Sequence, residues 1–188
     1  MFERFTKDAR AVVVGAVGHC ERSGGEWVEE AHLLLALLDR EGGRAAFALA
    51  SLGLEGRRDA VERSLAEARR CGGLTRADAD ALAGLGIDLT EIVSRVEEAH
   101  GEGALTPGRT AGGVRRPGRR LFTRGAKDLL SQSLRLALAH GDRHIGDEHL
   151  LLALTARPGV PSEVLADHGV TYAAVERLLW GQAGTKAG

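Results

Sequence analysis

The feature that most constrains this chain is an internal repeat at a fixed offset of 117 residues. At this offset Phe5-Thr6 aligns with Phe122-Thr123, and the six residues His32–Leu37 (HLLLAL) align with six identical residues, His149–Leu154. With one or two deletions the alignment continues to the Val-Glu-Arg triplets that begin at positions 61 and 175. Two copies of about 60 residues are therefore predicted to build the same supersecondary unit twice.

Each copy has the pattern of four helices. In the first copy Thr6 is a plausible N-cap, and the apolar residues that follow recur at intervals of three and four until Gly24-Gly25. A second helix is predicted at about 29–40, a third at about 44–52 and a fourth up to about Arg70. Because no stretch shows sustained period-two alternation, we predict an all-α fold, a pseudo-twofold pair of four-helix repeats.

The segment between the copies predicts additional helices. Residues 81–87 (ALAGLGI) repeat the pattern of residues 48–54 (ALASLGL) at an offset of 33. We therefore predict repeat 1 at 1–70, an extra helical half-repeat at 71–100, a Gly/Pro/Arg-rich flexible linker at 101–120, repeat 2 at 121–182 and a disordered tail at 183–188.

Charge and cysteine usage exclude several classes. The 25 Lys and Arg residues balance 26 Asp and Glu residues, so the chain has no global field toward nucleic acid or membrane. Cys20 and Cys71 lie far apart without a CxxC motif, which argues against a disulfide framework or a thiolate zinc site. The N-terminus shows no apolar leader segment and no apolar run is long enough to span a bilayer. We expect a cytoplasmic protein.

Two motifs resemble a known family. The opening residues Met1–Thr6 (MFERFT) and the segment Ile145–Leu154 (IGDEHLLLAL) are similar to the Clp N-terminal (Clp R) repeat domain of actinobacterial ClpC-type unfoldases, whose corresponding motif is IGTEHLLLGL. The resemblance implies a docking module that receives substrates and adaptors. None of the three lysines follows a glycine, so the chain has no Walker A motif, and we expect a stand-alone domain without AAA+ modules.

The resemblance also implies candidate binding residues. In the family the Glu of the TEH motif contacts the guanidinium of phosphoarginine, and the phosphate lies near a helix N-terminus. Glu148 matches that Glu, while Asp147 replaces the Thr and is expected to be an N-cap. Glu30 and Ala31 are the matching pair in the first copy, so that copy lacks the guanidinium partner. The alternative is that Asp147 and Glu148 only stabilise a first helical turn.

A second set of candidates matches the groove in which the mycobacterial domain binds antibacterial cyclic peptides. Phe2, Phe122 and Lys127 occupy these positions. Exposed aromatic residues are typical of binding hot spots, and the chain has few aromatic residues. The alternative for Phe5 and Phe122 is that they pack at helix starts.

The remaining residue patterns indicate structural roles rather than catalysis, metal binding or nucleic-acid binding. His32 and His149 precede the leucine runs, and we predict that they hydrogen-bond to neighbouring loops rather than catalyse a reaction or bind a metal. No GxSxG motif occurs. An arginine cluster falls on the linker and the start of the second copy, and it is interpreted as solvated chain, with nucleic-acid binding as the alternative. Its members are Arg115, Arg116, Arg119, Arg120 and Arg124.

The sequence therefore predicts a non-catalytic protein that binds protein or peptide partners of the Clp system and needs no cofactor. It would act as an adaptor, a decoy or a regulator of the unfoldase. The alternative from another class is a regulatory nucleic-acid-binding protein that uses the arginine-rich linker.

Overall fold

The computed structural model describes residues 2–106 and 121–181, and within them helices build almost the whole fold. In the first repeat the elements are η1 (Phe2–Arg4), α1 (Lys7–Arg22), β1 (Trp27–Val28), α2 (Glu30–Leu38), α3 (Arg44–Ser51) and α4 (Arg58–Arg70). The insertion holds α5 (Arg76–Gly84) and α6 (Leu89–His100). The second repeat comprises β2 (Leu121–Phe122), α7 (Arg124–Ala139), α8 (Asp147–Ala156), α9 (Val160–Asp167) and α10 (Tyr172–Trp180). The all-α fold is confirmed.

The helix starts repeat between the copies. Thr6 and Thr123 are the N-caps of α1 and α7, and each hydroxyl accepts the amide N–H three residues ahead, at 3.2 and 3.1 Å. The two leucine-rich helices share a second device, because Nδ1 of the third-position histidine accepts the N-cap amide in both. These bonds are 3.0 Å long and join Glu29 to His32 in α2 and Gly146 to His149 in α8. The predicted Thr6 N-cap is confirmed.

Short parallel bridges cross between the repeats. Phe5, just before α1, pairs with Ile145, just before α8. In the same way Val28, just before α2, pairs with Phe122, just before α7. The amide N–H of Thr6 donates to the carbonyl of Ile145 at 2.9 Å, and that of Thr123 donates to the carbonyl of Val28 at 3.0 Å. The two contacts are equivalent at the 117-residue offset, which is the pattern of a two-fold interface within one chain.

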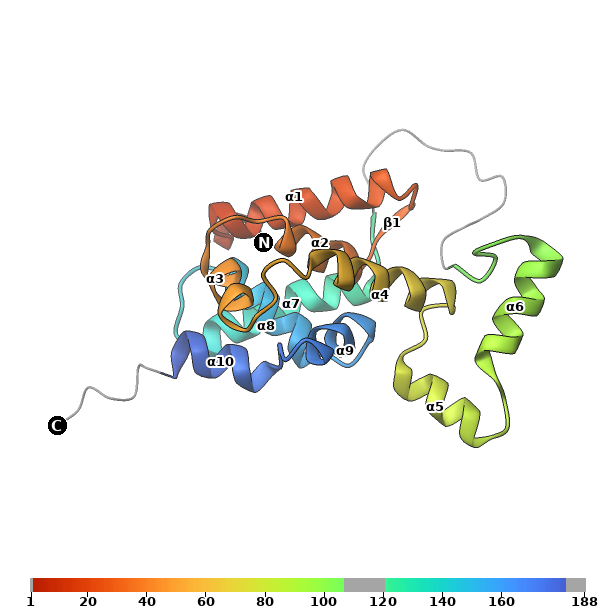
Figure 1. Cartoon of the computed structure of the whole chain (residues 1–188). Coiled ribbons are helices and arrows are strands. Elements are labelled where there is room, and N and C mark those ends of the chain that lie inside the picture. Colours follow the sequence, from red (N-terminus) through yellow and green to blue (C-terminus); the bar gives the residue numbers. More distant parts are fainter. Residues whose placement is uncertain (1, 107–120, 182–188) are drawn as a thin grey trace.

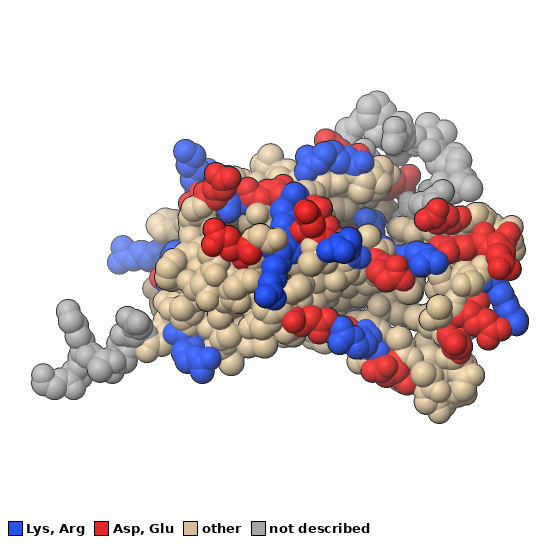
Figure 2. All heavy atoms as spheres, viewed as in Figure 1, with Lys and Arg blue, Asp and Glu red and all other residues tan. Residues whose placement is uncertain are grey.

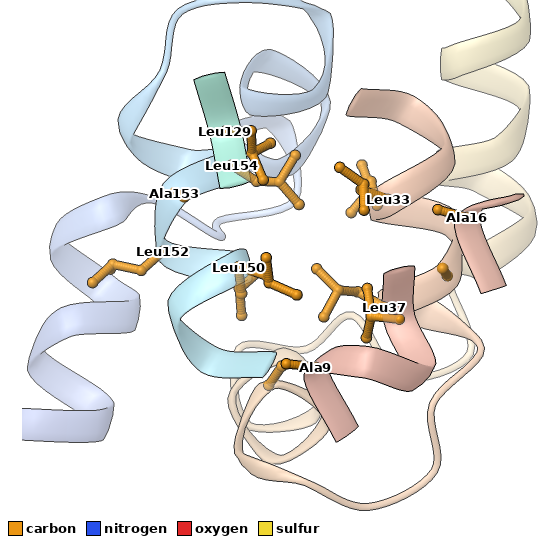
Figure 3. Packing of buried hydrophobic residues seen from close by; sticks show 14 of the residues in the cluster. Ala9, Ala16, Leu33, Leu37, Leu129, Leu150, Leu152, Ala153 and Leu154 are labelled. Atoms are coloured by element: carbon orange, nitrogen blue, oxygen red, sulfur yellow. The ribbon is translucent and has the colours of Figure 1, made fainter. Parts of the chain in front are cut away.

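The core lies where α2 and α8 meet (Figure 3). Leu33 and Leu37 of α2 face Leu150 and Leu154 of α8, and none of the four side chains is more than 2% exposed. Each repeat also packs on the other, since α3 contacts α8 and α4 contacts α9. The repeats therefore share one core instead of forming two.

Helices α5 and α6 project from this bundle (Figure 1). Helix α5 has no buried residue, and α6 buries only Val93. Residues 107–120 of the predicted linker and the predicted tail at 183–188 lie outside the described residues. Within the described part of the chain, no helix is long and apolar enough to cross a membrane.

Candidate functional site

Asp147 and Glu148 lie side by side in the first turn of α8 and are 3% and 6% exposed. The N-cap of α8 is Gly146, so the expectation that Asp147 is the N-cap is wrong. Its Oδ2 instead accepts the amide N–H of Ala45 in α3 at 3.1 Å and satisfies an N-terminal donor of a different helix. Gly43 makes this approach feasible, because it has a φ of +91° and a side chain there would collide with the Asp147 carboxylate.

The Glu148 carboxylate is paired with an arginine of the first repeat. Nη1 of Arg44 donates to Oε1 of Glu148 at 3.1 Å, and Nη2 donates to the carbonyl of Leu179 at 3.1 Å. The same guanidinium lies 5.0 Å from the centre of the Trp180 ring, within reach of a cation–π contact. The guanidinium that Glu148 contacts in the structure is that of Arg44, and its contact with phosphoarginine stays a prediction.

Burial governs the electrostatics of this region. Burial, with a hydrogen bond to Glu148 adding to it, raises the pKa of Asp147 to about 6. Burial lowers the pKa of His149, although nearby Asp142 opposes the shift. Asp147 therefore keeps its proton to a higher pH than an exposed aspartate does, and the His149 imidazole stays neutral to a lower pH than an exposed histidine.

Asp142, Glu148 and His149 are close enough in space to suggest a metal site. However, Nδ1 of His149 accepts the Gly146 amide, so Nε2 carries the proton and donates to Asp142 at 3.1 Å. Both ring nitrogens are used, and the imidazole offers no lone pair to an ion. The predicted hydrogen bond of His149 to a neighbouring loop is confirmed. His32 has the same role, with Nε2 at 3.3 Å from Ser23 Oγ.

The equivalent place in the first repeat is open. Here Glu30 and Ala31 stand where Asp147 and Glu148 stand in the second repeat, and Val160 and Pro161 replace Arg44 and Ala45. Valine has no guanidinium and proline has no amide N–H, so neither interaction of the second repeat can form. The result is a cavity of about 250 Å³, which we call the α2–α9 cleft. It is lined by Glu29, Glu30, Ala31, Leu65, Ala68, Arg69, Gly73, Gly159, Val160 and Pro161.

The charged groups of the α2–α9 cleft are partly satisfied by the protein. Glu29 pairs with Arg69 at 3.4 Å, and burial raises the pKa of Glu29 while Arg69 opposes the rise. Glu30 accepts a hydrogen bond from the Thr123 hydroxyl at 3.4 Å, over the first turn of α7. Gly125 leaves room for that carboxylate, since any side chain at this position would collide with it. Two carboxylates and one guanidinium make the cleft acidic.

The cyclic-peptide candidates lie at two ends of the molecule. Phe122, half-buried in β2, and exposed Lys127, one turn into α7, share the end at which α1 finishes. Phe2 belongs to η1 at the start of α1, and its side chain is outside the described part. Since α1 has 16 residues, about 24 Å separate its two ends. The groove stays a prediction, and the backbone does not bring Phe2 to the other two residues.

Sequence reasoning missed Arg44 and Trp180. Arg44 lies 104 residues from Glu148, and no local pattern marks either residue as a partner of the second repeat. Of the arginine cluster, only Arg124 lies within the described residues. It is exposed and 4.0 Å from Asp128.

Comparison with known proteins supports the repeat architecture. Residues 121–187 match the Clp repeat (R) N-terminal domain. The second repeat is therefore similar to the Clp repeat (R) N-terminal domain. The N-terminal domain of the chaperone ClpD from Arabidopsis thaliana is 18% identical, with a TM-score of 0.53 over 95% of this chain and 96% of that one. The Hsp104 N-terminal domain from Candida albicans is 14% identical, with a TM-score of 0.50 over 97% and 93%. The Clp N-domain fold thus extends over both repeats.

Replacement of Arg44 tests its contact with Glu148. Arg44→Ala should lower the free energy of unfolding by about 1–2 kcal/mol, because Glu148 would be left buried without its partner while water screens part of the loss. Arg44→Lys should recover only part of it, since an ammonium cannot make both hydrogen bonds and the ring contact. Urea unfolding measures both. The control is Arg95→Ala, whose partner Glu91 is exposed, and equal losses in Arg44→Ala and the control would contradict the assignment.

Asp147 should make stability depend on pH. Its pKa of about 6 in the folded protein exceeds the unfolded value of about 3.9, so between these values the folded state binds more protons and the stability contribution of Asp147 falls as pH rises. Asp147→Asn removes this term and keeps an acceptor for Ala45. The stability of the variant relative to wild type should therefore grow by about 2 kcal/mol from pH 4 to pH 7. Urea titrations at each pH measure both stabilities. A difference between Asp147→Asn and wild type that stays constant from pH 4 to pH 7 would refute the prediction.

Proposed function

We propose that this chain is a non-catalytic, cytoplasmic docking domain of the Clp unfoldase–protease system that binds segments of protein partners in the α2–α9 cleft. The observation that supports this proposal is the difference between the repeats. Arg44 and Asp147 of the chain itself fill the place beside α8, whereas the equivalent place beside α2 is a cavity. In the cytoplasm Cys20 and Cys71, which form no disulfide with each other, remain thiols.

The chemistry of the α2–α9 cleft indicates what it binds. Leu65, Val160 and Pro161 supply apolar surface, and Glu29 and Glu30 supply carboxylates. Its volume of about 250 Å³ is below that of a pocket for a drug-sized ligand and suits one or two side chains. We therefore expect unfolded or extended segments in which an apolar side chain lies next to a basic one.

Phosphoarginine is not the ligand that we propose. Its guanidinium would need Glu148, which already pairs with Arg44, and its phosphate would meet Asp147. We infer that the acids of the second repeat serve the fold and that ligand binding belongs to the first repeat.

We expect such a domain to act on an unfoldase only by binding the same partners. The 188 residues contain no Walker A motif, so any effect on an unfoldase comes from the occupancy of shared partners. Whether the protein serves as an adaptor, a decoy or a regulator then depends on its concentration and affinity relative to other docking domains.

Binding to an unfolded polypeptide tests this proposal. Fluorescein-labelled casein should bind saturably in fluorescence anisotropy, and Val160→Asp, which replaces apolar surface of the cleft with a charge, should weaken binding at least tenfold. The matched control is Val14→Asp, because Val14 is an exposed valine (71%) on α1, away from the cleft. Equal affinities for the two variants, or no binding of casein by wild type, would disprove the proposal.

Calorimetry with free phosphoarginine tests the remaining alternative. Wild type should show no saturable heat. Saturable binding that is lost in Glu148→Ala would instead assign ligand binding to the second repeat.

A further inference from the structure

Helices α5 and α6 form a third copy of the half-repeat that α3–α4 and α9–α10 also form. In the three copies a leucine-glycine or histidine-glycine turn is followed by one apolar residue, which is Leu54, Ile87 or Val170. The second helix of each copy then carries an apolar residue four positions after its N-cap, which is Val61, Ile92 or Val175. These positions allow the environments of the three copies to be compared directly.

The comparison shows that the apolar residues of the third copy are exposed where those of the other two copies are buried. Leu54 and Val170 are 3% and 0% exposed, but Ile87 is 37% exposed. Val61 and Val175 are fully buried, but Ile92 is 42% exposed. In the two buried copies the cover is a leucine-rich helix, because α2 packs on α3 and α4, and α8 packs on α9 and α10. No described element takes that place over α5 and α6.

Polar contacts hold the α5–α6 hairpin to the bundle. Arg70 of α4 donates three hydrogen bonds of 2.8 to 3.2 Å to the carboxylate of Glu97 in α6. At the start of α5 the amide of Arg76 donates to Glu163 at 2.7 Å, and its guanidinium pairs with Asp167. These polar contacts anchor the hairpin while Ile87 and Ile92 stay exposed.

The rim of this apolar face is acidic. Residues 76–100 contain six Asp and Glu residues against two arginines, and both arginines are in ion pairs. Figure 2 shows acidic side chains gathered over α5 and α6. Two copies of the hairpin would bring like charges together, so charge complementarity favours a basic partner over a second copy of this chain. The exposed acids are Asp78, Asp80, Asp88, Glu91 and Glu98.

We propose that the α5–α6 hairpin is a second docking surface, which binds a leucine-rich amphipathic helix with basic flanks from a partner protein. The partner helix takes the position over α5–α6 that α2 and α8 take over the other two half-repeats. Leucines pack on Ile87 and Ile92, and Lys or Arg side chains meet the acidic rim. This surface is separate from the α2–α9 cleft and does not depend on the function proposed for it.

A pair of designed helices tests the surface. The probe is a labelled 18-residue amphipathic helix with leucine on one face and lysine elsewhere, and its twin has glutamate in place of lysine. The lysine helix should bind wild type saturably in fluorescence anisotropy, and the glutamate helix should bind at least tenfold more weakly. Ile87→Asp and Ile92→Asp should each weaken binding of the lysine helix at least tenfold. Leu138→Asp, at an exposed leucine (58%) on α7, should not.

Three results would overturn the proposal. The first is equal binding to Ile87→Asp, Ile92→Asp and Leu138→Asp, and the second is equal binding of the two helices to wild type. The third is a wild-type dimer in sedimentation that Ile87→Asp dissociates, which would make a second copy the occupant. Circular dichroism checks that the variants fold, which is expected because both isoleucines lie at the surface. Casein binding should be unchanged in them, so failure here is distinguishable from failure of the α2–α9 cleft.

Discussion

The contact between the two leucine-rich helices, α2 and α8, is the interaction on which the rest of the structure depends. Both helices are apolar on most sides, and each can be buried only if the other repeat helps to cover it. The crossed bridges before α1 and α7, and the packing of α3 on α8, follow from this requirement. A sequence that repeats itself has thus become one core with approximate two-fold symmetry, not two domains in series.

The approximate two-fold symmetry gives the two repeats equivalent surfaces, and these surfaces differ in the side chains that line them. Beside α8, Arg44 and the Ala45 amide satisfy two buried acids. Beside α2, Val160 and Pro161 offer no such groups, and a cavity remains. A few substitutions on a common backbone therefore separate a structural site from a candidate binding site. The third half-repeat, α5–α6, differs further, because it retains the apolar pattern and no helix within the described residues covers it.

Much of the fold could be predicted from the sequence, because local signals determine it. The apolar spacing, the N-cap Thr6 and the 117-residue repeat predict helices that the structure contains. The strand pair between Val28 and Phe122 could not be predicted, since two residues are too few for a pattern. Nor could the pairing of Arg44 with Glu148, which depends on how the repeats pack. Aligning the repeats identified Glu30 as a candidate, but only packing shows that its surroundings are open.

Amide hydrogen exchange with and without bound casein tests most directly whether the repeats have divided these roles. The amides at 29–31 and at 159–160 lie in the α2–α9 cleft, and those at 147–149 lie at the filled equivalent place. The first group should exchange more slowly when casein is bound, whereas the exchange at 147–149 should not change. Protection confined to 147–149 would show that the second repeat binds partners and would contradict this account.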